Sequence, residues 1–205
     1  MEYSSFVFSN SPKWACVPSA IIEHWHWEGD KPFRPFSFAQ LCGVYGKGLF
    51  VRLWSFEENP RCVCTKRDDP VYQDSCLELF LQLVPGNTAY INIEMNCKGV
   101  YLSQFGKKRM NRVFLKDCCK LEPVVYAFEL EEDGGTAWGI ELFLSEDLVS
   151  EIYGMEYTLQ PCTFKGNFYK CGDKTPRAHY GAYFPVGSAA LGFHNPSKFG
   201  SISLK

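Results

Sequence analysis

Carboxylate and amide side chains occupy alternate positions in two short segments of the chain, residues 77–83 and 90–96. The first segment carries Glu78, and the second carries Asn92 and Glu94. These groups accept and donate hydrogen bonds in pairs, which suits the neighbouring hydroxyl groups of a sugar. The pattern therefore indicates a polar surface that could bind a carbohydrate. The alternative is an ordinary solvated face of a sheet.

Aromatic side chains precede these polar groups and gather again late in the chain. Tyr72 lies just before the first polar segment, and Tyr180, Tyr183, Phe184 and Phe193 cluster in the C-terminal part. An aromatic ring in a loop can stack on the C–H face of a pyranose ring, which buries apolar area while the hydroxyls reach polar neighbours. Most aromatic residues of a small domain belong to its core instead, so both roles stay open.

Two catalytic arrangements are conceivable from the residue types in these parts of the chain. Glu78 and Glu94 could form the carboxylate pair of a glycosidase, and Cys171 with His179 could form a thiol nucleophile and its base. The alternative is that residues 166–173 form only a structural loop. The chain contains no nucleophile elbow, phosphate-binding loop or dinucleotide fingerprint. We therefore predict that the chain has no catalytic residues and is not an enzyme.

Ten cysteines raise the questions of disulfides and of metal binding. Structural zinc sites bring two short-spaced ligand pairs, usually with Cys-x-x-Cys spacing, and no pair here has it. We therefore predict free thiols and no metal site or cofactor. The closest-spaced candidates are Cys62 with Cys64, His24 with His26, and Cys118 with Cys119.

Composition excludes two classes of partner. The 205 residues are 46% hydrophobic, carry a net charge of -2 and contain no run of five like charges. Because binding to nucleic acid requires clustered cations, we expect no nucleic-acid partner. No apolar stretch is long enough to span a membrane, and the N-terminal residues lack the pattern of an export signal. We expect no membrane partner and a cytoplasmic location.

The elements that must position these residues are mainly strands. Apolar residues alternate with polar ones through residues 77–83 and 90–96, and residues 85–88 have turn chemistry between them. These two segments are predicted to be neighbouring antiparallel strands. Turn residues at regular spacing separate the other short strand patterns, which is typical of a β-sandwich. The other predicted strands are 4–8, 40–45, 49–56, 100–105, 124–130 and 137–144.

Helical patterns are few. Residues 145–152 begin with Ser145, a good N-cap residue, and Gly154 follows them as a possible helix end. Residues 18–24 form a second candidate helix. Residues 166–205 are predicted to be ordered loops with a final short strand at 201–204. Because no linker, repeat or change of composition interrupts the chain, we predict one domain over residues 1–205: an all-β, antiparallel sandwich with one or two short helices.

Five stretches carry a resemblance to a known family. In their order along the chain, they resemble motifs of the family 9-like carbohydrate-binding modules, which belong to the DOMON-like β-sandwiches. The similarity runs from about residue 35 to residue 204. It implies a non-catalytic sandwich, of jelly-roll or immunoglobulin-like form, that binds sugars. In xylanase-linked members of the family, binding is through the reducing ends of glycan chains. The stretches are LFVRL (49–53), VYQDSCLELF (71–80), YINIEMNCKG (90–99), GNFYKCGD (166–173) and FHNPSKFG (193–200).

The resemblance also implies a set of site residues. Two tryptophans hold the sugar ring in family members, and their positions fall on Tyr72 and Phe193 in this chain. We expect both rings to stack on the sugar, so that alanine at either position would abolish binding without changing thermal unfolding. The implied polar contacts are Glu78, Asn92 and Glu94.

Tyr183 is a third candidate for stacking on the sugar. Some family members bind structural calcium, but this chain lacks a dense acidic loop apart from Asp68, Asp69 and Asp74, so we predict none. Because both tryptophans are replaced, an interaction domain whose sugar site has decayed is an alternative function. A glycan-processing enzyme is another.

Overall fold

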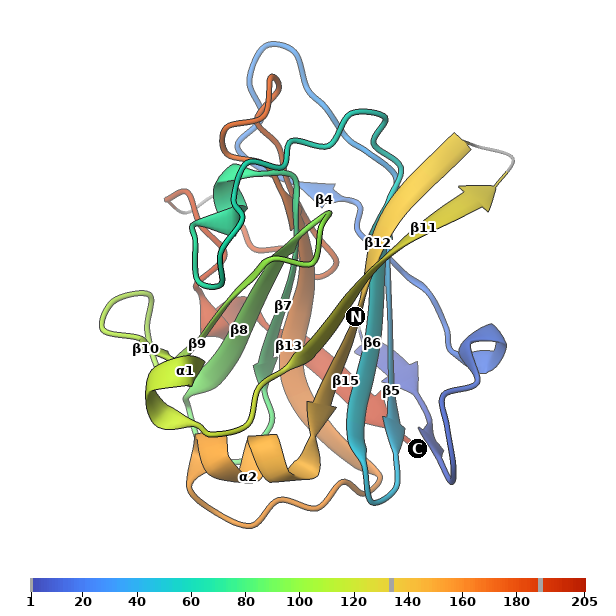
Figure 1. Ribbon diagram of the computed structural model, residues 1–205, viewed down its shortest axis with the longest axis vertical. Helices are drawn as coiled ribbons and strands as arrows, with labels where there is room; N and C mark the ends of the chain where they lie inside the picture. Colours follow the sequence, from blue (N-terminus) through green and yellow to red (C-terminus); the bar gives the residue numbers. More distant parts are fainter. Residues whose placement is uncertain (1, 133–134, 188–189) are drawn as a thin grey trace.

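The computed structural model describes residues 2–132, 135–187 and 190–205, which form two sheets packed face to face (Figure 1). Within these residues, sheet A has nine strands and sheet B has six. In sheet A the hydrogen-bonded order is β1 (Glu2–Ser5), β15 (Gly200–Leu204), β13 (Cys162–Cys171), β7 (Cys76–Gln82), β8 (Tyr90–Asn96), β9 (Tyr101–Gly106) and β10 (Val113–Phe114), with β14 (Tyr180–Ala182) on β13 and β4 (His24–Trp25) on β14. In sheet B the order is β11 (Val124–Glu132), β12 (Gly135–Ser145), β6 (Gly48–Ser55), β5 (Ser37–Val44) and β2 (Val7–Phe8), with β3 (Ala20–Ile21) on β5.

The predicted sandwich and its antiparallel pairing are confirmed. Strands β7 and β8 are antiparallel neighbours, and their register places Glu78 opposite Glu94. Two pairings, β1 with β15 and β2 with β5, are parallel instead. Both pairings involve the N-terminal segment, in which β1 is an edge strand of sheet A and β2 is an edge strand of sheet B. Within the described residues, no helix is long and apolar enough to cross a membrane.

The helix predicted at residues 145–152 is confirmed as α2 (Glu146–Tyr153). The Ser145 side chain accepts a hydrogen bond from the Leu148 amide, and Gly154 ends the helix at a φ of 64°. The described part of the chain also contains a one-turn helix, α1 (Leu115–Cys118), and three short 3-10 turns. These turns are η1 (Trp14–Cys16), η2 (Val71–Gln73) and η3 (Pro196–Lys198).

The helix predicted at residues 18–24 is wrong. This segment contains β3 and ends at the first residue of β4, and β3 pairs with the edge of β5. Ala20 and Ile22 are buried, whereas Ile21 between them is 47% exposed. This alternation suits an edge strand with one face on a core, but it is too short for the sequence alone to distinguish it from a helical turn.

The prediction that residues 166–205 are mostly loops is also wrong at its start. Residues 162–171 form β13, which lies between β7 and β15 in sheet A. Phe168 packs in the core between the sheets, and Tyr169 packs on the opposite face of sheet A. A strand buried on both faces shows no alternation of apolar and polar residues, so its sequence gives no strand signal. The final strand is confirmed as β15.

Sheet A is covered on both faces. Its inner face carries Leu77, Leu79 and Leu81 into the main core against sheet B. On its outer face lies a second apolar group, which we call the outer cluster; it includes Phe80, Tyr90, Tyr169, Phe193 and Phe199. Chain segments between the strands cover this outer face. The polar face predicted for the two alternating strands is therefore buried rather than solvated.

Candidate functional site

A cavity of about 430 Å³ opens on the outer face of sheet A, beside the outer cluster. We call it the sheet pocket. Strands β7, β8, β9 and β13 form its floor, and the segments before β7, after β9, after β13 and after β14 form its walls. The strand residues that line it are Glu78, Phe80, Glu94, Leu102, Gln104 and Cys171. The loop and edge residues are Asp68, Pro70, Tyr72, Arg109, Phe114, Asp173, Tyr180, Leu191, Gly192, Phe193 and His194.

Four of the six predicted site residues line this pocket: Tyr72, Glu78, Glu94 and Phe193. Asn92 lies behind Glu94 and hydrogen-bonds to it. The sixth, Tyr183, lies elsewhere. Its ring packs against the main core, with its centroid 6.0 Å from that of Tyr3.

The backbone explains the position of Tyr183. Ala182, the residue before it, belongs to the outer cluster. Successive side chains of an extended segment point to opposite faces, so Tyr183 is directed toward the other side of sheet A. Its amide donates to the Phe168 carbonyl and continues the β14 pairing by one residue. Tyr183 is therefore not part of the sheet pocket.

The Glu94 carboxyl is oriented by a chain of hydrogen bonds. Arg112 Nε donates to Asn92 Oδ1 at 2.9 Å, and Asn92 Nδ2 donates to Glu94 Oε1 at 2.8 Å. Glu94 is 4% exposed, and its burial raises the pKa of the carboxyl to about 7. Among the described residues, no group hydrogen-bonds to Glu94 Oε2. This oxygen is a buried acceptor that lacks a protein donor.

Arg112 is a fixed part of the scaffold. Its Nη2 donates to the Tyr90 carbonyl at 2.9 Å, and its Nη1 donates to the carbonyls of Gly106 and Lys108. The guanidinium carbon lies 4.0 Å from the centroid of the Tyr90 ring. These contacts hold the arginine in one orientation, so it can position Asn92 and, through it, Glu94.

Glu78 occupies a different environment on the neighbouring strand. Its Oε1 accepts a hydrogen bond from the Cys171 thiol at 2.9 Å. Burial, followed by the proximity of Cys171 and Glu94, raises the pKa of Glu78 well above its usual value. A protonated Glu78 can donate a hydrogen bond, whereas Glu94 can supply the free acceptor. The floor of the pocket thus offers both kinds of partner that a hydroxyl group needs.

The two predicted aromatic positions differ in exposure. Tyr72 is 37% exposed, whereas Phe193 is 5% exposed. The Phe193 ring stacks on Tyr169, with centroids 4.1 Å apart and an angle of 14° between the ring planes. Trp27 lies close to it as well, with a centroid distance of 5.8 Å. The Phe193 ring is therefore packed within the outer cluster, whereas the Tyr72 ring is partly open to solvent.

Sequence reasoning missed several polar residues that line the pocket, including Arg109, Asp173 and His194. His194 Nδ1 lies 2.9 Å from the Tyr90 hydroxyl. Burial, with the nearby Arg112 and Arg109 charges, lowers the pKa of His194 to about 3, so its imidazole is neutral at neutral pH. His194 does lie within a stretch that carries the family resemblance, but neither its type nor its spacing indicated a site.

The acidic residues considered for calcium are held apart by their own partners. Asp74 accepts from the amides of Val63 and Cys64, and Asp69 accepts from backbone amides in the loop before it. Asp68 lies 2.9 Å from Lys116 Nζ. The three carboxylates thus bind separate donors and do not form one oxygen-lined cage for calcium.

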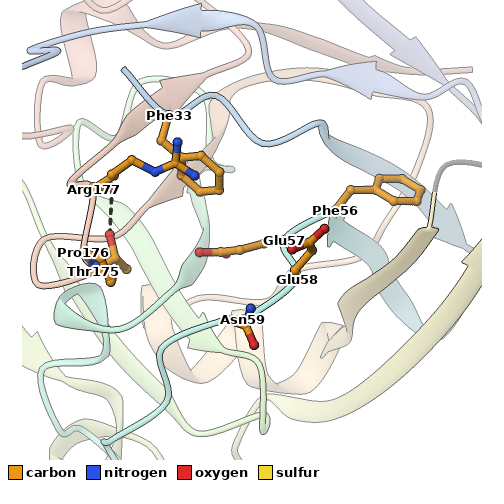
Figure 2. A pocket seen from close by; sticks show the side chains of 8 residues that line it. All are labelled: Phe33, Phe56, Glu57, Glu58, Asn59, Thr175, Pro176 and Arg177. Atoms are coloured by element: carbon orange, nitrogen blue, oxygen red, sulfur yellow. Dashed lines mark hydrogen bonds between the residues drawn. The ribbon is translucent and has the colours of Figure 1, made fainter. Parts of the chain in front are cut away.

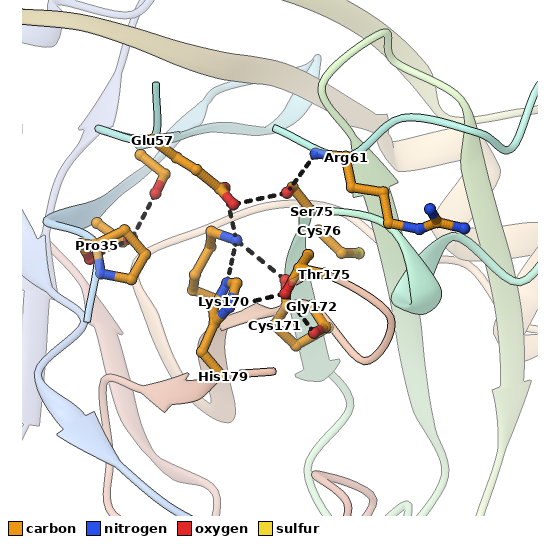
Figure 3. A network of polar contacts seen from close by, with 12 residues as sticks. Pro35, Glu57, Arg61, Ser75, Cys76, Lys170, Cys171, Gly172, Thr175 and His179 are labelled. Carbon is orange, nitrogen blue, oxygen red and sulfur yellow. Dashed lines mark hydrogen bonds and ion pairs between the residues drawn. The ribbon is translucent and has the colours of Figure 1, made fainter. Parts of the chain in front are cut away.

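The thiol and imidazole considered for catalysis are not brought together. Cys171 donates to Glu78 in the sheet pocket. His179 Nε2 lies 2.7 Å from the Nζ of Lys170, the residue before Cys171 in β13, and adjacent strand residues point to opposite faces (Figure 3). Burial and the Lys170 charge lower the pKa of His179 to about 4. The imidazole is therefore committed to Lys170 rather than to the thiol.

A second cavity, of about 440 Å³, lies near Lys170, whose side chain is buried. Arg177 lies over the Phe33 ring at one side of it, and Phe56 lies at the other (Figure 2). Its buried carboxylate, Glu57, forms an ion pair with Lys170 and accepts from Ser75. None of the predicted site residues lines this cavity. The sheet pocket is thus the better candidate for a functional site.

The sequence and the fold resemble those of known proteins. The sequence profile named carbohydrate-binding family 9 matches residues 14–204. No curated protein matches the chain. Among solved structures, a candidate carbohydrate-binding protein from Bacteroides uniformis has a TM-score of 0.80 and 23% identity, and the match covers 100% of this chain and 99% of that one.

Two further similar structures are of a family 9 carbohydrate-binding module from Caldicellulosiruptor kristjanssonii. One is in complex with glucose and has a TM-score of 0.60 at 14% identity, with 98% of this chain and 95% of that chain covered. The other is in complex with cellotriose and has a TM-score of 0.58 at 15% identity, with 98% and 93% covered. At these identities the likeness is one of fold.

Proposed function

The chain belongs to carbohydrate-binding family 9, and from this premise we propose that the sheet pocket is where it binds a sugar. The observation that carries the proposal is the meeting of three features in one pocket. These are the exposed ring of Tyr72, the buried carboxyl of Glu78, and the buried Glu94 oxygen that has no protein donor.

Each feature suits one part of a pyranose ring. A sugar hydroxyl donates to Glu94 Oε2 and so satisfies an acceptor that is otherwise costly to bury. A protonated Glu78 donates to a second hydroxyl. The Tyr72 ring covers a C–H face of the sugar. The volume of about 430 Å³ lies within the range of small-molecule sites, which is roughly 300–1,000 Å³.

The first ligands to test are glucose and short β-linked glucose oligomers, because the similar structures named above hold glucose and cellotriose. Phe193 contributes a wall of the pocket rather than a second exposed clamp. Asn92 acts as a positioning residue for Glu94.

Binding without catalysis is part of the proposal. Glu78 and Glu94 are directly opposite each other on adjacent strands, so they point out from the same face of sheet A. In a glycosidase the two carboxyl groups flank the scissile bond, one of them acting from the opposite face of the sugar ring. Two neighbours on one sheet face reach the same side of a bound sugar, which suits recognition of hydroxyls.

We also propose that the protein acts in a reducing compartment, as expected for a cytoplasmic location. All ten cysteines are free thiols, and several lie close together. The thiols of Cys118 and Cys119, for example, are 3.6 Å apart. Mass spectrometry of the alkylated protein isolated from its native cells tests this proposal. Ten alkylated cysteines are expected, and a disulfide in most of the molecules contradicts it.

Tyr72→Ala is expected to weaken glucose or cellotriose binding by about tenfold, which corresponds to loss of about 1.4 kcal/mol of ring contact. Because Tyr72 is partly exposed, the free energy of unfolding is expected to change by less than about 0.5 kcal/mol. Calorimetric titration and thermal unfolding measure the two effects. Tyr126→Ala is the control, since Tyr126 is 67% exposed on β11 of sheet B. Equal affinities of Tyr72→Ala and wild type would place the sugar elsewhere.

Sugar affinity is expected to rise between pH 6 and pH 8, because the Glu94 carboxyl, with a pKa of about 7, ionises in this interval. An ionised carboxylate accepts stronger hydrogen bonds than a neutral one. Glu94→Gln removes this titration, so its affinity is expected to be lower and flat over the same range. Titrations with cellotriose at several pH values measure both profiles.

The same residue gives a second readout. A carboxyl whose folded-state pKa is raised stabilises the protein below the unfolded pKa of about 4.5, and this contribution is lost as the pH rises through about 7. The melting temperature of wild type relative to Glu94→Gln is therefore expected to fall between pH 6 and pH 8. Parallel affinity profiles of the two proteins would mean that Glu94 does not contact the sugar, and parallel melting-temperature profiles would mean that its pKa is not raised in the folded state.

A further inference from the structure

Three side chains able to bind a metal meet at the floor of the sheet pocket: Cys76, Glu78 and Cys171. Their ligand atoms all lie within 4.8 Å of one another. All three side chains are buried, with exposures of 0%, 3% and 2%. Within the described parts of the chain, this is the one group of three or more such residues that is so closely spaced.

The register of sheet A builds this group. Cys76 of β7 is directly opposite Cys171 of β13 in an antiparallel pair. Glu78 follows two positions along β7, so it points to the same face as Cys76. The Cys171 thiol already contacts Glu78 Oε1 at 2.9 Å. The two cysteines are far apart in the sequence, which is why no short-spaced motif reveals them.

The donor set selects one class of metal. Two sulfur ligands and one carboxylate oxygen suit a thiophilic ion such as Zn²⁺, whereas Ca²⁺ and Mg²⁺ require oxygen ligands. Zinc bonds of about 2.3 Å to sulfur and about 2.0–2.2 Å to oxygen place the ligands of a tetrahedral site roughly 3.5–4 Å apart. The ligand atoms are at most 4.8 Å apart, so the longest of their separations must shorten by about 1 Å to reach this geometry.

Glu78 and Cys171 also line the sheet pocket, so the group is open on one side. We propose that Cys76, Glu78 and Cys171 bind a thiophilic divalent metal ion of the zinc class, with the fourth coordination position facing the pocket. Water or a ligand hydroxyl completes the tetrahedron there. The two thiols and, where it is protonated, Glu78 release their protons to solvent as the ion binds, and no electron is transferred.

Binding of Co²⁺ to the reduced full-length chain tests the proposal, because cobalt coordinated by thiolates absorbs in the near ultraviolet and a tetrahedral site adds visible bands. Cys118, which is exposed, and its neighbour Cys119, which is partly buried, are first changed to serine to remove a competing pair. One Co²⁺ per chain is expected, with sulfur-to-cobalt absorption that Zn²⁺ abolishes. Zn²⁺ is also expected to raise the melting temperature.

The variants define the ligands. Cys76→Ser and Cys171→Ser are expected to lose the sulfur-to-cobalt absorption, and the isosteric Glu78→Gln is expected to bind at least about tenfold more weakly. Cys162→Ser is the matched control, because Cys162 lies at the other end of β13. Circular dichroism establishes that each variant is folded. Absence of the absorption in the parent protein, or its persistence in both Cys76→Ser and Cys171→Ser, would overturn the proposal.

The proposed metal site and the proposed sugar site can be tested independently of each other. Cellotriose binding is measured on protein stripped with a chelator, so it does not depend on the metal. Tyr72→Ala is expected to retain Co²⁺ binding because Tyr72 supplies no side-chain ligand. Sugar binding without Co²⁺ absorption would overturn only the metal site, and Co²⁺ absorption without sugar binding would overturn only the proposed function.

Discussion

Glu57→Gln is expected to lower the free energy of unfolding by about 3–5 kcal/mol, because it removes the counter-ion of a buried lysine. Lys170 is 0% exposed, and its Nζ lies 3.1 Å from Glu57 Oε2. The same ammonium donates to the Cys171 carbonyl and contacts His179 Nε2 (Figure 3). Both of these partners are neutral, since His179 has a pKa of about 4. Glu57 is therefore the one negative charge among the groups that bind the Lys170 ammonium in the described structure.

Chemical denaturation at neutral pH measures this effect. Glu28→Gln is the matched control, because Glu28 forms an ion pair with Arg34 at the surface, where such pairs contribute about 0–1 kcal/mol. A loss of less than about 1 kcal/mol in Glu57→Gln would mean that Lys170 finds solvent or another anion, and that the network in Figure 3 is not closed.

The alternation of residues made part of this molecule predictable. Leu77, Leu79 and Leu81 of β7 face the main core. Because successive side chains of a strand point to opposite faces, Glu78 lies on the other face of the sheet. The same reasoning placed Glu94 on that face of β8. Period-two patterns are local, and they report reliably on a strand that has one uniformly apolar face.

What covers the outer face could not be predicted in this way. Tyr169 and Phe193 come from late segments of the chain, and they bury the face that the pattern of β7 and β8 left polar. Strand β13 has no alternation because both of its faces are buried. The Cys76–Cys171 pairing depends on the register between strands that are distant in sequence, and no local pattern encodes that register.

The resemblance to the family placed Tyr72 and Phe193 at the pocket but did not determine their exposure. Tyr72 lies in the short turn η2, and its side chain is partly exposed to solvent. Phe193 lies against the ring of Tyr169, which belongs to the unpredicted strand β13. Exposure of an aromatic residue depends on its neighbours in space, so the two positions that the resemblance treats alike differ in burial.

This difference leads to the second large effect. Phe193→Ala is expected to lower the free energy of unfolding by about 3–5 kcal/mol, the usual cost of truncating a buried phenylalanine. The ring is 5% exposed and stacks on Tyr169 with a centroid distance of 4.1 Å. Phe193→Leu keeps most of the volume and is expected to cost less than about 1.5 kcal/mol. Denaturant unfolding of the two variants measures both values.

Cellotriose titration of Phe193→Leu then separates packing from stacking. If Phe193 acts as a packed wall, a leucine side chain still fills that wall, and the affinity of the variant is expected to stay within about threefold of wild type. A ring that stacks on the sugar cannot be replaced by leucine, because the aliphatic side chain has no flat π face. Unchanged stability of Phe193→Ala, together with lost binding in Phe193→Leu, would mean that Phe193 swings out of the outer cluster and closes on the sugar opposite Tyr72.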